Sequence, residues 1–382
     1  MIRLGVIGAV LLLWLAPALP QDTSTRERAR VLAQADRYLT DAPTTVTASH
    51  SPRSAGGVHD YFSEGDYWWP DPANPDGPYL QRDGMSNPGN FDEHRKALMR
   101  LSVEMPALTA AYLLTHDRKY ALAAGRHADA WFVAAATKMT PALRYAQAIH
   151  GRVTGRGTGI IDTIHLVEVA RALERLDGAP GWGPESARST RRWFADYLDW
   201  LTTDQYGRDE RDTTNNHATC WVMQVAAFAH YTGNEPLLRD CRGRFKTVLL
   251  QQMAADGSFP RELARSKPYG YSLFNLEAMA TICQILSTRN DDLWTYELPD
   301  GRGMRRAMAF MVPYIRDKQT WPKPPDVMYD GAWPMRQASL LFAGRALGEP
   351  SYLQLWSTLP ADSNVEEVIR NFFVRQPRLW VD

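Results

Sequence analysis

The sequence predicts an all-α protein whose helices pair into hairpins around a funnel, forming an incomplete α/α barrel or toroid. From Phe91 onward, apolar residues recur at helical spacing, whereas strand patterning is weak throughout. Residues 112–120, 231–237 and 346–352 each indicate a helix, a tight turn and a second helix, at intervals of roughly 115 residues. A superhelical array would give the same repeat. The toroid is favoured because the long irregular segments need a surface to cover.

The first element is a predicted secretory signal peptide over residues 1–20. Arg3 supplies its positive end, residues 4–15 its apolar run and residues 16–18 a small-residue cleavage site. The apolar run is too short for a stable transmembrane helix, and no later stretch qualifies. We therefore expect a secreted or periplasmic protein without a membrane span, whose mature chain, residues 21–382, forms one catalytic domain.

An irregular segment separates the first helix of the mature chain from the others. Periodicity predicts a helix over 25–39, and residues 40–90 are then rich in Pro, Gly, Asp and aromatic side chains, including Tyr67, Trp68 and Trp69. A loop of that length in a compact domain is usually functional, so we predict a lid or one wall of a cleft. The remaining helices are predicted over 92–115, 117–136, 160–176, 186–203, 216–232, 234–252, 272–287, 303–316, 333–347 and 363–374.

Composition excludes several classes of function. The 43 Lys and Arg residues equal the 43 Asp and Glu residues, so no global field attracts nucleic acid or an anionic membrane. An anionic polymer would have to be met by a local basic groove. The three cysteines, an odd number without close spacing, argue against a disulfide framework or a zinc site. His165 and Glu168 could share a metal ion but have no third partner nearby, so we expect no metal or other cofactor.

Four side chains form the candidate catalytic set. Asn216 and His217 lie at a predicted helix start, where the macrodipole disfavours an imidazolium and keeps a neutral base available. Arg265 and Tyr271 lie on a loop leading into a later predicted helix. A phenol can protonate a leaving oxygen, and a neighbouring guanidinium helps it accept a proton. This set suits removal of a proton beside a carboxylate, which the amide and guanidinium would hold.

These residues also have structural interpretations. The asparagines can simply cap a helix, leaving His217 as an ordinary first-turn residue. Arg265 can pair with Glu262 while Tyr271 covers the core. The basic, glycine-rich stretch 144–159 has two interpretations that the sequence favours equally: a loop that faces a carbohydrate, or a loop whose glycines only mark turns. In the functional interpretation, its Gln147 and Arg156 reach sugar hydroxyls or carboxylates.

In chain order, these motifs resemble the alginate lyase superfamily of secreted polysaccharide lyases. The resemblance extends over about residues 30–343 and implies an α/α toroid that cleaves its substrate by β-elimination, without metal or organic cofactor. The motifs that carry it are Ser51–Tyr61 (SPRSAGGVHDY), Asp66–Asp71 (DYWWPD), Tyr145–Gln147 (YAQ), Gly155–Gly157 (GRG), Asn215–His217 (NNH), and Glu262–Arg265 (ELAR) followed by Tyr271-Ser272.

The resemblance implies a role for each residue of the site. Asn216 and His217 match the family's catalytic Asn-His pair, Arg265 matches its carboxylate-neutralising arginine, and Tyr271 matches its catalytic tyrosine. Residues 60–79 fall where those lyases carry a mobile lid. The substrate contacts that we assign are Gln147, Arg156, Tyr67, Trp68, Trp69 and Tyr269.

The expected partner is an anionic polysaccharide, a 1,4-linked polyuronate such as alginate, and polymannuronate is the preferred form. We expect the enzyme to be a monomer. Glucuronan has the same configuration at C4 and C5 and remains an alternative for the same four residues. Two other classes also remain: a glycoside hydrolase on a similar toroid, using Asp209, Glu210 or Asp212, and a non-catalytic sugar-binding protein.

Overall fold

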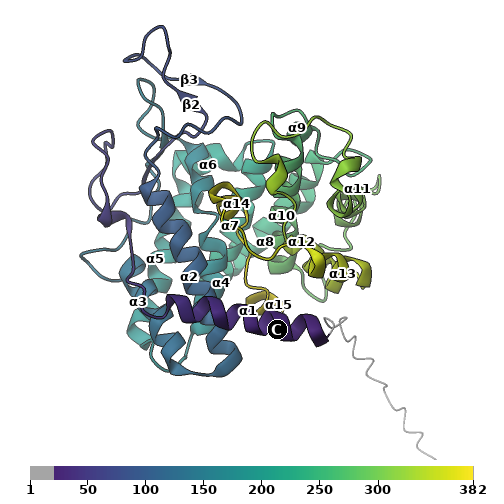
Figure 1. Ribbon diagram of the computed structural model, residues 1–382, viewed down its shortest axis with the longest axis horizontal. Coiled ribbons are helices and arrows are strands. Elements are labelled where there is room, and N and C mark those ends of the chain that lie inside the picture. The colour runs from purple at the N-terminus through teal and green to yellow at the C-terminus, as the bar shows by residue number, and fades with distance from the viewer. Residues whose placement is uncertain (1–20, 382) are drawn as a thin grey trace, which may run out of the picture.

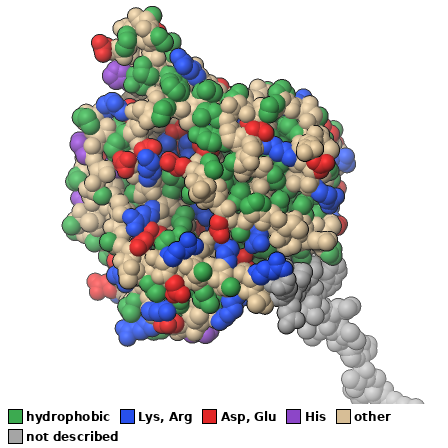
Figure 2. Space-filling model, in the orientation of Figure 1, with side chains coloured by type: hydrophobic (Ala, Val, Ile, Leu, Met, Phe, Trp, Pro, Cys, Tyr) green, Lys and Arg blue, Asp and Glu red, His purple; other side chains and the backbone are tan. Residues whose placement is uncertain are grey.

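The computed structural model describes residues 21–381, and the predicted signal peptide lies outside the described residues. Its fold is the predicted helical one (Figure 1). One described helix, α2 (Glu93–Thr115), is long and apolar enough to cross a bilayer, but 72% of its most apolar window is buried inside the protein. The face seen in Figure 2 carries intermixed acidic and basic side chains, as the balanced composition predicts.

Heavily buried helices alternate along the chain with helices that bury one face. In α7 (Asn216–Thr232), 14 of 17 residues are buried, against three of 13 in α8 (Glu235–Thr247). A helix that is apolar on all sides belongs inside, whereas an amphipathic one covers it. The inner helices are α2, α4 (Leu166–Leu176), α7, α10 (Pro268–Leu286) and α12 (Ala338–Ala346), and each packs against the next. The outer helices are α1 (Gln21–Tyr38), α3 (Arg118–Phe132), α5 (Pro184–Thr203), α8, α11 (Met304–Arg316) and α13 (Pro350–Thr358).

The predicted irregular segment contains short strands that the sequence analysis did not predict. Strand β1 (Phe62–Glu64) pairs in parallel with β4 (Tyr145–Ala148). Strands β2 (Trp68–Trp69) and β3 (Leu80–Gln81) form an antiparallel hairpin that projects at the top of Figure 1. Strands this short have too few residues for an alternating pattern to be visible in the sequence.

Several helix boundaries differ from the prediction. The helix predicted over 160–176 is a 3₁₀ segment, η2 (Gly157–Thr163), followed by α4. The helix predicted from residue 333 begins at Ala338, because Pro334 disfavours helical backbone at the residue before it. Helices that were not predicted are short: α6 (Gln205–Arg211), α9 (Pro260–Leu263) and α15 (Arg378–Val381). Helix α13 is the second helix that the pattern at residues 346–352 indicates, and α14 (Glu366–Asn371) is shorter than expected.

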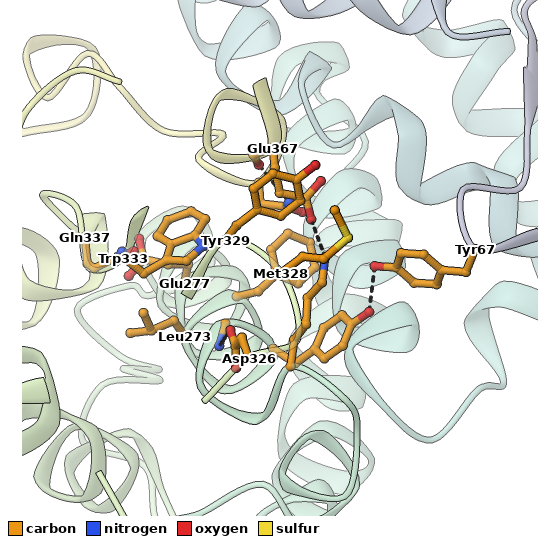
Figure 3. Close-up of a pocket in the computed structure, with 14 residues that line it drawn as sticks. Tyr67, Leu273, Glu277, Asp326, Met328, Tyr329, Trp333, Gln337 and Glu367 are labelled. Carbon is orange, nitrogen blue, oxygen red and sulfur yellow. Dashed lines mark hydrogen bonds and ion pairs between the residues drawn. The ribbon is translucent and has the colours of Figure 1, made fainter. Parts of the chain in front are cut away.

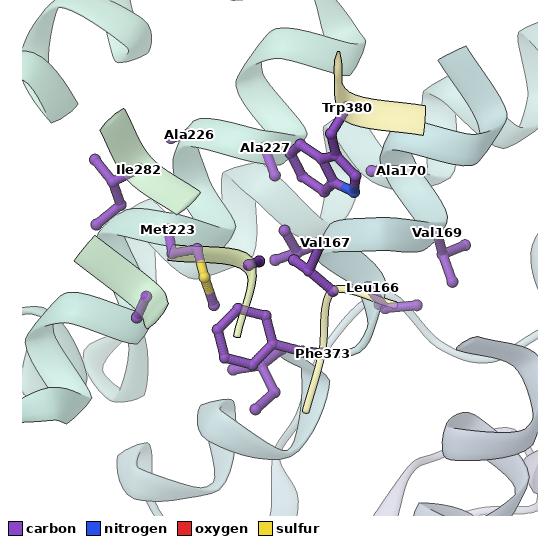
Figure 4. Packing of buried hydrophobic residues seen from close by; sticks show 14 of the residues in the cluster. Leu166, Val167, Val169, Ala170, Met223, Ala226, Ala227, Ile282, Phe373 and Trp380 are labelled. Carbon is purple, nitrogen blue, oxygen red and sulfur yellow. The ribbon is translucent and has the colours of Figure 1, made fainter. Parts of the chain in front are cut away.

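The C-terminal segment is fixed inside the ring of inner helices. Phe373 and Trp380 pack among apolar side chains of α4, α7 and α10 (Figure 4). The carboxylate of Glu168, on α4, accepts backbone N–H groups of residues 375 and 376 and the indole N–H of Trp380. His165 and Glu168 therefore serve the core, and all three cysteines are buried free thiols.

Candidate active site

The double-asparagine motif lies at the start of α7, as predicted, but its amide does not cap the helix. Asn215 has extended backbone and makes no side-chain cap bond. Instead, Glu262 of α9 accepts the backbone N–H of Asn216 at 2.8 Å and its side-chain N–H at 2.6 Å. A carboxylate at a helix N-terminus is favoured by the macrodipole. Asn216 is thereby fixed, and the alternative pairing of Glu262 with Arg265 is not the one that forms.

His217 is oriented by a carboxylate that the sequence analysis considered only for a hydrolase. Its Nδ1 lies 2.6 Å from Oε1 of Glu210, which is fully buried, while the imidazole remains 21% exposed. When Nδ1 donates its proton to this carboxylate, Nε2 is left as the acceptor of the ring. The other two hydrolase candidates are engaged elsewhere, Asp209 with Gln205 and Asp212 with Arg211.

Arg265 and Tyr271 come together with Tyr67 of the irregular segment. The hydroxyl of Tyr271 lies 3.2 Å from Nη2 of Arg265 and 2.7 Å from the hydroxyl of Tyr67. The guanidinium carbon lies 4.3 Å from the centre of the Tyr271 ring. Burial raises the pKa of Tyr271, although Arg265 and the Tyr67 hydrogen bond oppose that rise. Tyr271 therefore remains a phenol at neutral pH, with two donors close to its oxygen.

A pocket opens beside this tyrosine pair (Figure 3). Tyr67, Tyr329 and Trp333 contribute aromatic surface to its lining. A buried ion pair at 2.9 Å joins Lys267 to Glu367, and the ammonium also lies over the rings of Tyr67 and Tyr329. Within the described residues, no group of three or more His, Cys, Asp and Glu side chains is arranged to hold a metal ion.

A buried ionic network holds the segment that carries Tyr67. Asp66 accepts hydrogen bonds from Arg95 at 2.6 Å and from Arg370, so α2 and α14 fix the residue next to Tyr67. Asp162, whose side chain is fully buried, accepts a hydrogen bond at 2.5 Å from Ser63 of β1. Because a buried charge without its partner is costly, these pairs define where the segment can lie.

The structure places the residues predicted to contact the substrate in different surroundings. Arg156 donates to Gln147 at 2.8 Å and lies over the ring of Trp68, so these three side chains form one group next to Tyr67. Gln147 is nearly buried and also donates to Asp162, which makes it a support for Arg156. Trp69 lies on the same strand as Trp68.

Tyr269 requires a correction, because the structure places it in the core. Its side chain is fully buried, its ring packs edge-on against Trp321, and its hydroxyl donates to the carbonyl of Tyr314. Tyr269 and Tyr271 are two residues apart on α10, and residues at that spacing point to different sides of a helix. Only Tyr271 faces the site.

Three carboxylates hold the candidate residues in pairings that the sequence analysis did not predict: Glu210, Glu262 and Asp83. Glu262 belongs to the Glu262–Arg265 motif, which the sequence analysis had identified. That membership was the available signal that Glu262 has a role in the site. Asp83 forms a two-pronged ion pair with Arg265, and nothing in its local sequence indicates this. The pairing depends on two segments 182 residues apart.

The comparisons with known proteins agree with this architecture. A family model described as alginate lyase matches residues 45–321. The crystal structure of an alginate lyase from Bacteroides ovatus is 31% identical with a TM-score of 0.80, over 92% of this chain and 94% of that one. A histidine-to-alanine variant of alginate lyase A1-III, solved with a tetrasaccharide, shares the fold at 14% identity, with a TM-score of 0.57 over 96% and 97% of the chains. The search of curated proteins gave no match.

Proposed function

The chain belongs to the alginate lyase family of polysaccharide lyases, and from that premise we propose that it cleaves alginate, preferably polymannuronate, by β-elimination. The observation that carries the proposal is the position of the Tyr271 hydroxyl, within hydrogen-bonding distance of both Arg265 and Tyr67. The reaction removes H5 of a uronate, expels O4 and leaves a 4,5-unsaturated sugar at the new end. We further infer that it acts outside the cytoplasm.

In the first step, Asn216 and Arg265 hold the carboxylate of the uronate to be cleaved. Loss of H5 moves negative charge onto that carboxylate, and fixed donors stabilise it better than mobile water does. A preorganised donor of this kind is typically worth roughly 3 kcal/mol of barrier. Glu262 supports this role because its bond to one amide hydrogen fixes the plane of the Asn216 side chain.

Tyr271 is the proposed acid that protonates O4 as the glycosidic bond breaks. Burial raises its pKa, so the proton is present when the substrate arrives. In β-D-mannuronate, H5 and O4 lie on the same side of the ring, so Tyr271 can serve in turn as base and acid. Its own proton first passes to solvent, the phenolate then takes H5, and the phenol so formed gives that proton to O4. Arg265 and Tyr67 would then stabilise the transient phenolate, since both can donate to its oxygen.

The imidazole supplies a base on the opposite face. In α-L-guluronate, H5 and O4 lie on opposite sides, so a second group must take H5, and His217 is the candidate. Glu210 acts as a positioning residue here, because its hydrogen bond to Nδ1 leaves Nε2 to accept a proton. Trp68, Trp69 and Arg156 are proposed contacts to neighbouring sugars.

A substrate panel tests the proposal. Polymannuronate, polyguluronate, glucuronan and hyaluronan are incubated separately with the protein, and near-ultraviolet absorbance follows the new C4–C5 double bond. We expect the fastest rise with polymannuronate. Reducing ends without absorbance would indicate a hydrolase, and a fastest rise with glucuronan would reassign the substrate. No reaction with any polymer, together with oligouronate binding that Tyr271→Phe and His217→Ala leave intact, would indicate a binding protein.

A further inference from the structure

Arg265, which the proposed mechanism needs for the substrate, is already bound to a carboxylate of this chain. Nη2 of Arg265 donates to Oδ1 of Asp83 at 2.6 Å, and Nε donates to Oδ2 at 3.2 Å. Ser266 adds its hydroxyl at 2.7 Å and its backbone N–H at 3.2 Å, both to Oδ2. Two parallel bonds from a guanidinium are the way that arginine recognises a free carboxylate. Asp83 thus takes the place of a ligand.

The backbone around Asp83 lies close to Ser266, yet the ion pair between Asp83 and Arg265 remains accessible to solvent. The next residue, Gly84, has φ +74°, and a Cβ there would lie 2.3 Å from Oγ of Ser266. Only glycine allows the backbone to approach this near without strain. The ion pair is only partly covered, because the side chains of Arg265 and Asp83 remain 27% and 35% exposed. Arg265 and the Ser266 bonds lower the pKa of Asp83, so it is ionised at neutral pH.

We propose that Asp83 is an internal competitor for the substrate: it occupies the guanidinium of Arg265 until a uronate carboxylate displaces it. This inference rests on the proposed function, because it assumes that Arg265 receives that carboxylate. A guanidinium already paired with Asp83 cannot neutralise a second carboxylate with the same two N–H groups. Asp83 therefore lowers the apparent affinity for every uronate, and displacing it releases residues 82–85 from Ser266.

The test measures binding alone, in a Tyr271→Phe background that prevents turnover. Isothermal titration with a mannuronate tetrasaccharide compares this parent with a second protein that also carries Asp83→Ala. We expect about tenfold tighter binding without the internal carboxylate. Two further variants, Ser266→Ala and Gly84→Ala, weaken the same contact while keeping Asp83. Both should tighten binding, and they decide the outcome if Asp83→Ala fails to fold.

Asp76→Ala is the matched control, since Asp76 is an exposed carboxylate of the same segment, whereas the ion pair of Arg265 is with Asp83. It should leave the affinity unchanged. If Asp76→Ala tightens binding as much as Asp83→Ala, the effect is one of general charge and the proposal is wrong. Unchanged or weaker binding in the Asp83, Ser266 and Gly84 variants also overturns it. Failure of the parent to bind any oligouronate would instead reject the proposed function, and this inference with it.

Discussion

The imidazole of His217 takes its orientation from a residue seven positions earlier in the chain. Glu210 is fully buried, and its second oxygen, Oε2, has no hydrogen-bond partner. A buried carboxylate with one partner stabilises a donor strongly, because little water competes for the bond. At the residue scale, each proposed catalytic side chain is bonded to a carboxylate or to a hydroxyl. The partners are Glu262, Glu210, Asp83 and Tyr67.

Changing Glu210 to Gln should separate the two proposed bases. The amide oxygen can still accept the Nδ1 proton, so the tautomer is kept while the negative charge is lost. We expect kcat on polyguluronate to fall about tenfold with little change in KM, and a smaller fall on polymannuronate. Steady-state absorbance assays on the two polymers check this. Equal losses of kcat on the two polymers would contradict the proposal that they use different bases. On polyguluronate, Glu210→Ala should lower kcat more than Glu210→Gln does.

Changing Tyr271 to Phe removes one oxygen from the site and keeps the ring under Arg265. Because the phenol is the proposed acid for both stereochemistries, we expect kcat to fall by at least about a thousandfold on every polyuronate. Titration calorimetry should show tetrasaccharide affinity within about threefold of wild type. Residual turnover above a tenth of wild type would argue that another group protonates O4. Tyr269→Phe is the matched control, as it should alter stability only.

At the scale of elements, a buried acid joins two inner helices. Glu277 of α10 accepts the backbone N–H of Ser339 at the start of α12. Burial raises the pKa of Glu277 to about 7, which is above the ordinary value for an unfolded chain. Between about pH 4.5 and 7, the folded protein therefore holds a proton that the unfolded chain has lost. That difference makes the folded state lose stability as pH rises.

Glu277→Gln should abolish this pH dependence. The amide keeps an acceptor for Ser339 but has no charge to desolvate. Above pH 7, we expect the variant to be more stable than wild type by up to about 3 kcal/mol, and below pH 4 the difference should vanish. Urea unfolding at a series of pH values measures it. A constant difference across that range would mean that Glu277 does not titrate with folding.

At the scale of the whole molecule, the last residues of the chain close the core between helices of the first and second halves. Trp380 is 6% exposed, donates to Glu168 of α4 and packs against Phe342 of α12. None of these contacts reaches the site around Tyr271. The C-terminal segment therefore serves stability, and its effect on the chemistry is indirect.

Trp380→Ala should destabilise the fold without changing the site. Removal of a buried indole typically costs about 3–5 kcal/mol, and it also leaves one oxygen of Glu168 with fewer donors. Thermal unfolding should show a lower Tm, while KM at a temperature well below the transition remains as in wild type. An increase in KM for folded protein would show that the segment affects the cleft after all.

The sequence by itself determined the order of the main helices and the position of the candidate catalytic motif. The helix predicted over 216–232 coincides with α7, and its first residues are Asn216 and His217. Helical period, turn residues and helix starts depend on neighbours within a few positions, so they can be recognised without the fold. The same reasoning from residue types identified Arg265 and Tyr271 as candidates, the family resemblance implied a role for each, and the structure brings the two into contact.

Only the tertiary structure decided which partners hold those residues. Glu210, Glu262 and Asp83 pair with His217, Asn216 and Arg265 across separations of 7 to 182 residues. No periodicity marks such pairs, because ion pairs and hydrogen bonds depend on where distant segments meet. The same reason separates Tyr271 from Tyr269: both are tyrosines on one helix, and only the packing of α10 against its neighbours turns one toward the site and the other into the core.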